Sequence, residues 1–192
     1  RALELGATDF LAKPVDASEL RLRLRNTLAF RAYQNRLANY DLVTGLPNRR
    51  FFLKYAEQIL RAAKRHGHAC ALLQINLNRF KQINETLGQS AGDALLRETA
   101  RRLRIAVRET DPVASASGGD ELSHIGGDEF TVMLERVQKV EHASVAARRI
   151  LAALAEPYRI DSREITLTSR VGIALFPEDA SASIILLQHA GA

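Results

Sequence analysis

The stretch that decides the fold is residues 125–134, which read IGGDEFTVML. Its two glycines, Gly126 and Gly127, allow a tight turn in which the backbone approaches a ligand closely. The acids that follow, Asp128 and Glu129, can hold a divalent cation or accept a proton. The apolar run after them favours a strand. Acidic glycine turns also occur in ordinary hairpins, so this stretch alone leaves a plain turn and a phosphate site both open.

Outward from this turn, hydrophobic periodicity predicts alternating helices and strands. Helices are predicted over residues 49–65, 78–87, 91–108, 140–155 and 181–190. Strands are predicted over residues 69–77, around Val113 and over 130–134, with a further hairpin between 158–160 and 165–176. Helices mixed with hairpins predict an α/β (α+β) sandwich, with a central, mostly antiparallel sheet flanked by helices.

The first 40 residues predict a short strand followed by a long helix. The strand, at residues 9–12, ends at Lys13 and Pro14. Asp16 and Glu19 then form a capping-box-like helix start. The period-two alternation of residues 20–25 taken alone suggests a strand, but the cap and the helix formers that follow favour one helix to about Tyr40.

Length, composition and cysteine content limit the classes of protein to which this chain can belong. A chain of 192 residues with 46% hydrophobic content can hold one domain and a fragment of another. No apolar run reaches the roughly 20 residues of a membrane helix, and no secretory signal is visible. The single cysteine, Cys70, lies in an apolar run and is interpreted as a buried residue of a reducing compartment, so we predict a cytoplasmic protein.

The net charge of +5 does not indicate a nucleic-acid site. The basic residues are scattered over several segments and aromatic residues make up only 6% of the chain, which favours solvated helix faces. We therefore predict no nucleic-acid partner and no membrane partner.

Four stretches, in chain order, resemble the GGDEF family of diguanylate cyclases. Besides the Gly126–Phe130 signature, they are DLVTGLPNRR at 41–50, NRFKQINETLGQSAGD at 78–93 and VGIALFPED at 171–179. The resemblance covers roughly residues 41–192. It implies a nucleotidyl-cyclase or palm-like fold, which makes or senses cyclic di-GMP from GTP in bacterial signalling.

The resemblance also implies roles for residues in the nucleotide site. Asn84 and Asp93 would hydrogen-bond the guanine base, for which their amide and carboxylate groups are suited. Gly126 and Gly127 would pass close to the triphosphate. Lys81 is assigned to the same GTP site.

For the chemistry, the resemblance implies Mg²⁺ or Mn²⁺ bound by Asp128, with Glu129 activating the attacking 3′-hydroxyl or supporting the metals. Two such half-sites would meet in a homodimer, each 3′-hydroxyl attacking the α-phosphate of the other GTP. The family usually has a second metal-binding aspartate at the end of the first strand, where this chain has Asn76. A neutral amide binds Mg²⁺ less well than a carboxylate.

Other departures concern the surroundings of the signature. A first copy, GGDEL at 118–122, precedes it, and the strand after Glu129 favours the second copy as the site. Arg108 and Asp111 resemble the family's RxxD inhibitory site for cyclic di-GMP, but 14 residues, 112–125, separate them from the signature. A surface arginine and aspartate at a helix end explain this pair equally well.

Two functions follow from these observations. The first is an active diguanylate cyclase. The second is a catalytically degenerate module that binds GTP and regulates or dimerises a partner, such as a downstream phosphodiesterase domain. Residues 1–30 resemble the end of a response-regulator receiver domain, with 31–40 as a linker helix and 41–192 as a GGDEF domain truncated in its C-terminal helix.

Overall fold

The computed structural model describes residues 16–110, 121–137 and 139–192. The chain divides into two compact units, Arg1–Ala38 and Asn39–Ala192. Within the described ranges, no helix combines the length and the hydropathy that crossing a membrane requires.

Helix α1 (Ala17–Asn39) accounts for nearly all the described residues of the first unit. As predicted, Asp16 caps it: the carboxylate accepts hydrogen bonds of 2.8 Å from the amides of Ser18 and Glu19. The Glu19 carboxylate binds Arg23 and does not close a capping box. The long helix is confirmed, whereas the strand predicted at 9–12 lies outside the described residues. α1 runs without a break across residue 30, and the domain boundary there stays a prediction.

A four-stranded antiparallel sheet forms the centre of the second unit. Its strands are β1 (Ala69–Leu77), β2 (Glu121–Gly126), β3 (Glu129–Val137) and β6 (Ser169–Phe176), in the order β2-β3-β1-β6. Every neighbouring pair is antiparallel, as predicted. β1 has the bounds predicted from its apolar run. It lies between β3 and β6, and its residues 70–75 are all buried.

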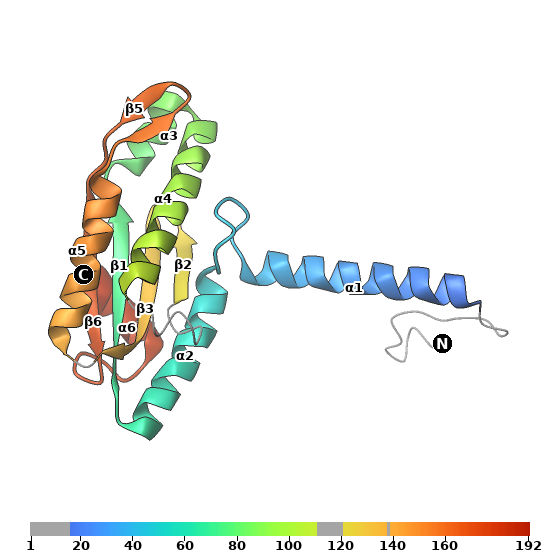
Figure 1. The fold of residues 1–192 in the computed structure, drawn as a ribbon, viewed down its shortest axis with the longest axis horizontal. Helices are drawn as coiled ribbons and strands as arrows, with labels where there is room; N and C mark the ends of the chain where they lie inside the picture. The colour runs from blue at the N-terminus through green and yellow to red at the C-terminus, as the bar shows by residue number, and fades with distance from the viewer. Residues whose placement is uncertain (1–15, 111–120, 138) are drawn as a thin grey trace. The chain divides into compact units, whose positions relative to one another are not determined.

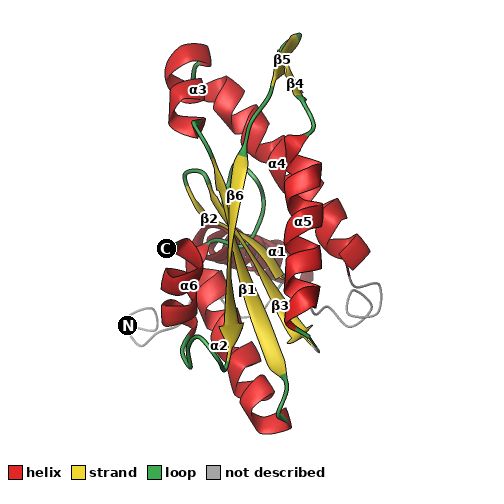
Figure 2. Cartoon of the chain, turned by 90° about the vertical axis from the view of Figure 1, so that its left-hand side faces the viewer, coloured by secondary structure: helices red, strands yellow, loops and turns green. Residues whose placement is uncertain are grey.

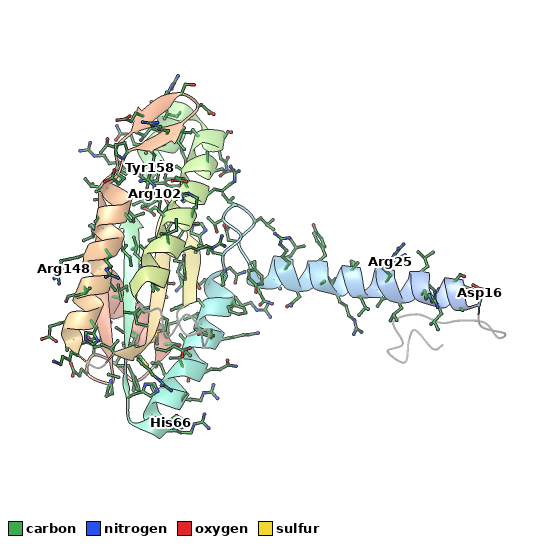
Figure 3. All side chains as sticks on the ribbon, viewed as in Figure 1. Asp16, Arg25, His66, Arg102, Arg148 and Tyr158 are labelled. Carbon is green, nitrogen blue, oxygen red and sulfur yellow. The ribbon has the colours of Figure 1, made fainter. Side chains whose placement is uncertain are left out.

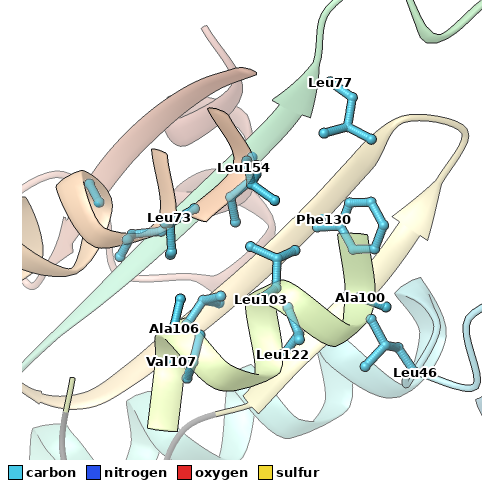
Figure 4. Packing of buried hydrophobic residues seen from close by; sticks show 14 of the residues in the cluster. Leu46, Leu73, Leu77, Ala100, Leu103, Ala106, Val107, Leu122, Phe130 and Leu154 are labelled. Atoms are coloured by element: carbon cyan, nitrogen blue, oxygen red, sulfur yellow. The ribbon is translucent and has the colours of Figure 1, made fainter. Parts of the chain in front are cut away.

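Helices cover both faces of this sheet (Figures 1 and 2). On one face lie α4 (Gln89–Thr110) and α5 (Val140–Ala155), and on the other α2 (Arg49–His66) and α6 (Ser183–Gly191); α3 (Phe80–Leu87) packs against α4. The buried side chains form one cluster on each face, and Figure 4 shows Leu73, Leu103 and Leu154 in the cluster beneath α4 and α5. Each fully buried leucine contributes about 1.5–3 kcal/mol. The predicted α/β sandwich is confirmed.

The hairpin near the C-terminal end differs from its prediction. β4 (Tyr158–Ile160) pairs with β5 (Arg163–Ile165) in a separate two-stranded sheet, while β6 pairs with β1. Asp161 and Ser162 form the turn, both with positive φ. Because of this tight turn, residues 163–165 fold back and pair with β4. The long run assigned to one strand is therefore two strands in two sheets.

The strand before the signature is β2, which contains Glu121 and Leu122 of the first GGDEL copy. The strand predicted around Val113 lies outside the described residues. Leu122 and Ser123 are buried, and β2 pairs antiparallel with β3. The second copy forms the turn between β2 and β3, as predicted.

Arg102 joins the end of α5 to α4. Its guanidinium donates hydrogen bonds to the carbonyl oxygens of Ala153, Glu156 and Pro157, and lies 4.0 Å from the centre of the Tyr158 ring (Figure 3). These bonds satisfy carbonyl groups that the helix end leaves without partners. Glu98, on α4, accepts a bond of 2.9 Å from the same guanidinium.

Cys70 is buried in β1, as predicted. Its thiol donates to the carbonyl oxygen of Glu135, with a distance of 3.0 Å between sulfur and oxygen. Burial, and to a lesser degree the charge of Glu135, raise the pKa of the Cys70 thiol to about 12. The thiol is therefore protonated at neutral pH.

Candidate functional site

The turn between β2 and β3, Gly126–Phe130, is called the signature turn. Gly126 and Gly127 have φ values of 135° and 58°, which other residues rarely adopt. A Cβ atom added at either glycine would meet nothing within 4 Å, so the backbone is open to a ligand. The carbonyl oxygen of Asp128 accepts a hydrogen bond of 3.1 Å from the Leu77 amide. The turn is thereby tied to the end of β1.

The sheet register places Asn76 directly opposite Glu129. The amide nitrogen of Asn76 lies 3.5 Å from a Glu129 carboxylate oxygen, at the outer limit of a hydrogen bond. The structure thus brings together Asn76, Asp128 and Glu129, which the sequence predicted as metal and catalytic residues.

This donor set suits Mg²⁺ only in part. In the described part of the chain, no three histidine, cysteine or acidic residues form a cluster that could hold a metal ion. The turn offers the carboxylates of Asp128 and Glu129, and Asn76, opposite Glu129 in the sheet, offers a neutral amide. Mg²⁺ is commonly held by one or two carboxylates together with substrate phosphates. The residues therefore fit a cation that a nucleotide triphosphate helps to hold.

The predicted base-binding residues lie where α3 meets the first turn of α4. The Asn84 side-chain oxygen is buried and has no hydrogen-bond partner among the described residues. A Cβ atom at Gly92 would lie only 1.8 Å from that oxygen, so a larger residue there would make the Asn84 amide shift. Asp93, the next residue, is half-buried. An unpartnered buried acceptor costs free energy unless a donor reaches it.

The three other predicted site residues, Lys81, Arg108 and Asp111, stay untested. The Lys81 side chain is 91% exposed and its ammonium lies 3.9 Å from Glu85, one turn along α3. Its role in GTP binding stays a prediction. Arg108 lies near the end of α4, but its side chain and the whole of Asp111 lie outside the described residues.

The sequence reasoning missed a buried pair beside the signature turn. His124, in β2, is 5% exposed, and its Nε2 lies 3.1 Å from the carbonyl oxygen of Gly127. Its Nδ1 lies 3.1 Å from a carboxylate oxygen of Asp41, and its ring stacks on Phe130 with 4.6 Å between centroids. Residues 41–48, called the entry loop, thereby contact the turn.

Asp41 is fixed within the entry loop. Its carboxylate accepts hydrogen bonds from the amide and the hydroxyl of Thr44, 2.7 and 2.6 Å long. Burial acts to raise the pKa of Asp41, but these bonds and the charge of His124 outweigh it, so the pKa lies below its usual value. The D-x-x-T spacing of Asp41 and Thr44 is a sequence signal for such a local cap, but nothing local indicated that its partner is His124.

Comparison of the sequence and the fold with known proteins identifies the family of this chain. Residues 38–192 match the family described as "Diguanylate cyclase, GGDEF domain". The chain belongs to the GGDEF family. This GGDEF domain resembles the solved GGDEF domain of TpbB from Pseudomonas aeruginosa, with a TM-score of 0.71 and 37% identity over 79% of this chain and 84% of that one.

Longer relatives share the GGDEF domain. The chain is 37% identical over 183 residues to diguanylate cyclase TpbB of Pseudomonas aeruginosa, which covers 95% of this chain and 39% of TpbB. It is 34% identical over 155 residues to cyclic di-GMP phosphodiesterase NbdA of the same organism, which covers 81% of this chain and 18% of NbdA. The chain thus spans less than half of either relative.

Proposed function

We propose that this GGDEF domain condenses two molecules of GTP to cyclic di-GMP, as a homodimer that uses Mg²⁺ or Mn²⁺. The observation that carries the proposal is the signature turn, whose two acids are held at the end of β1 by the register of Asn76 with Glu129 and by the bond from Leu77 to Asp128. The fit to the TpbB domain supports it.

Each group in the site has a task that suits its chemistry. Asn84 and Asp93 hold the guanine base, and Gly126 and Gly127 let the backbone approach the phosphates. Glu129 accepts the proton of the 3′-hydroxyl as that oxygen bonds to the α-phosphate of the partner's GTP, and pyrophosphate leaves. Asp128 and Asn76 would hold the cation, which offsets charge on the phosphates.

The second candidate is a module that binds GTP without turning it over. The observation that favours it is Asn76, which leaves the cation with one negative charge fewer than a second carboxylate would supply. The match to the phosphodiesterase NbdA fits a role beside a phosphodiesterase domain. In this case the GGDEF domain regulates or dimerises that partner.

One experiment separates the two functions. The chain is incubated with GTP and either Mg²⁺ or Mn²⁺, and the products are separated by chromatography. We expect cyclic di-GMP from the native chain and none from Glu129→Gln. The matched control is Glu141→Gln, on the exposed first turn of α5, which keeps the native rate. GTP binding without product in the native chain would establish the second function.

Further assignments rest on the sequence alone. We propose that Arg108 and Asp111 bind cyclic di-GMP as an inhibitory site, and that residues 1–30 are the end of a receiver domain. We also propose that the protein acts in the cytoplasm, where GTP is available to it.

A further inference from the structure

The imidazole of His124 lies between the entry loop and the signature turn and contacts both. Its two neighbours, a carboxylate of Asp41 and the carbonyl of Gly127, are acceptors that cannot donate. Nε2 faces the Gly127 carbonyl, and Nδ1 faces the Asp41 carboxylate. One buried ring therefore bridges the two segments.

The contact with Asp41 is close but is not an aligned hydrogen bond. Nδ1 lies 3.1 Å from the carboxylate and has no hydrogen-bond partner among the described residues. His124 is 5% exposed, so its ring is enclosed between the loop and the turn. Asp41 is fixed in the entry loop, since its carboxylate accepts a hydrogen bond from the Thr44 amide and its own amide donates to the Leu46 carbonyl.

We propose that His124 is a positioning residue that clamps the signature turn to the entry loop and so sets the place of Asp128 and Glu129. The clamp acts on both sides of these acids. It binds Gly127, which precedes Asp128, and it stacks on Phe130, which follows Glu129. The two acids therefore lie between two points fixed to one buried ring.

The test uses hydrogen exchange of single amides in the full chain. The Leu77 amide reports on the turn because it donates to Asp128, while the Leu73 amide, in the middle of β1, reports on opening of the whole sheet. In His124→Gln and Asp41→Asn, we expect exchange at Leu77 to accelerate at least about tenfold, because each variant alters a contact between the entry loop and the signature turn. Exchange at Leu73 should stay as in the native chain.

Two further variants complete the test. His142→Gln, at an exposed histidine on α5, is the matched control and should leave both amides unchanged. His124→Arg should restore slow exchange at Leu77, since arginine has several donors for the two facing oxygens and stacks on aromatic rings. Equal acceleration at Leu77 and Leu73 would show that His124 only supports the core. Native exchange at Leu77 in both neutral variants would overturn the clamp outright.

The consequence for turnover rests on the proposed cyclase function and is measured separately. If the native chain makes cyclic di-GMP, Asp41→Asn should lower kcat about tenfold or more while KM for GTP changes little, because base binding lies at Asn84 and Asp93. A rise in KM with unchanged kcat would contradict a positioning role. If the native chain makes no product, the cyclase proposal fails, and exchange at Leu77 still decides the clamp.

Discussion

The candidate site has two ends that are positioned in different ways: the base end, with Asn84, and the metal end, with Asn76 and Glu129. At the base end, Asn84 is placed by close packing of α3 on α4, with Gly92 leaving just the space that its side chain needs. At the metal end, Asn76 and Glu129 are placed by strand register inside the sheet. The packing contact depends on one missing methyl group, whereas the register depends on many backbone bonds. Binding and turnover are therefore expected to be separable by mutation.

The largest effect is expected at the base end, from Gly92→Ala. The new Cβ would displace the Asn84 amide, and losing the proposed hydrogen bond from Asn84 to guanine should weaken GTP binding roughly 10- to 100-fold, equal to about 1–3 kcal/mol. Because the displaced group is the end of a side chain, thermal stability should change little. Calorimetric titration with a non-hydrolysable GTP analogue measures the affinity. Asn84→Ala should cause the same loss, and the double variant no more, if Gly92 acts only through Asn84.

A second prediction checks that stability and GTP binding are independent. Arg102→Met keeps an apolar stem but removes the bonds to the last carbonyls of α5, which should lower the free energy of unfolding by about 2 kcal/mol. Urea unfolding gives this value, and Arg97→Met, on the exposed face of α4, is the control. GTP affinity at 25 °C should not change. A parallel loss of affinity would mean that the base end depends on the whole fold.

At the metal end, Asn76→Asp should raise the rate of cyclic di-GMP formation at limiting Mg²⁺ by about tenfold or more, since the added charge strengthens cation binding. Gln82→Glu adds the same charge on the exposed face of α3 and should leave the rate unchanged. Affinity for the nucleotide analogue without metal should stay at the native value. An unchanged rate in Asn76→Asp would show that Asn76 does not limit the metal end.

The smallest effect is expected far from both ends, at Glu98. Hydrogen bonds from Arg101, opposed by burial and aided by Arg102, lower the pKa of Glu98 to about 2. A folded-state pKa below the unfolded value of 4.5 stabilises the protein above pH 4.5, and this contribution is lost as the pH falls toward about 2. The pair is partly exposed, so it should contribute no more than about 1 kcal/mol. The melting temperatures of the native chain and of Glu98→Gln should therefore converge as the pH falls from 4.5 to about 2.

Local patterns predicted most of the fold because they arise within single elements. The apolar run of β1 and the cap at Asp16 were both read correctly from neighbouring residues. β5 and β6 were merged, since periodicity does not reveal which of two sheets a run of apolar residues joins. β2 was not predicted at Glu121–Gly126, because its place in the sheet comes from pairing with β3, which short-range patterns do not reveal.

The candidate site divides in the same way. The signature turn and Asn76 were recognisable because their chemistry lies in short motifs. The contact between Asp41 and His124 was not, since it joins segments far apart in the chain and each residue has an ordinary local role as well. Gly92 was also missed. Its importance arises from the exact fit of α4 on Asn84, which no spacing in the sequence encodes.

The single cysteine has a practical consequence. Cys70 is buried and its thiol, with a pKa of about 12, holds almost no thiolate at neutral pH. Maleimide dyes react with the thiolate, so the native chain should remain unlabelled without any substitution at Cys70. A cysteine introduced at an exposed position of α1, such as Arg25, would then take up one fluorophore. Energy transfer between dyes on two chains could report assembly in a protein whose own core residue needs no change.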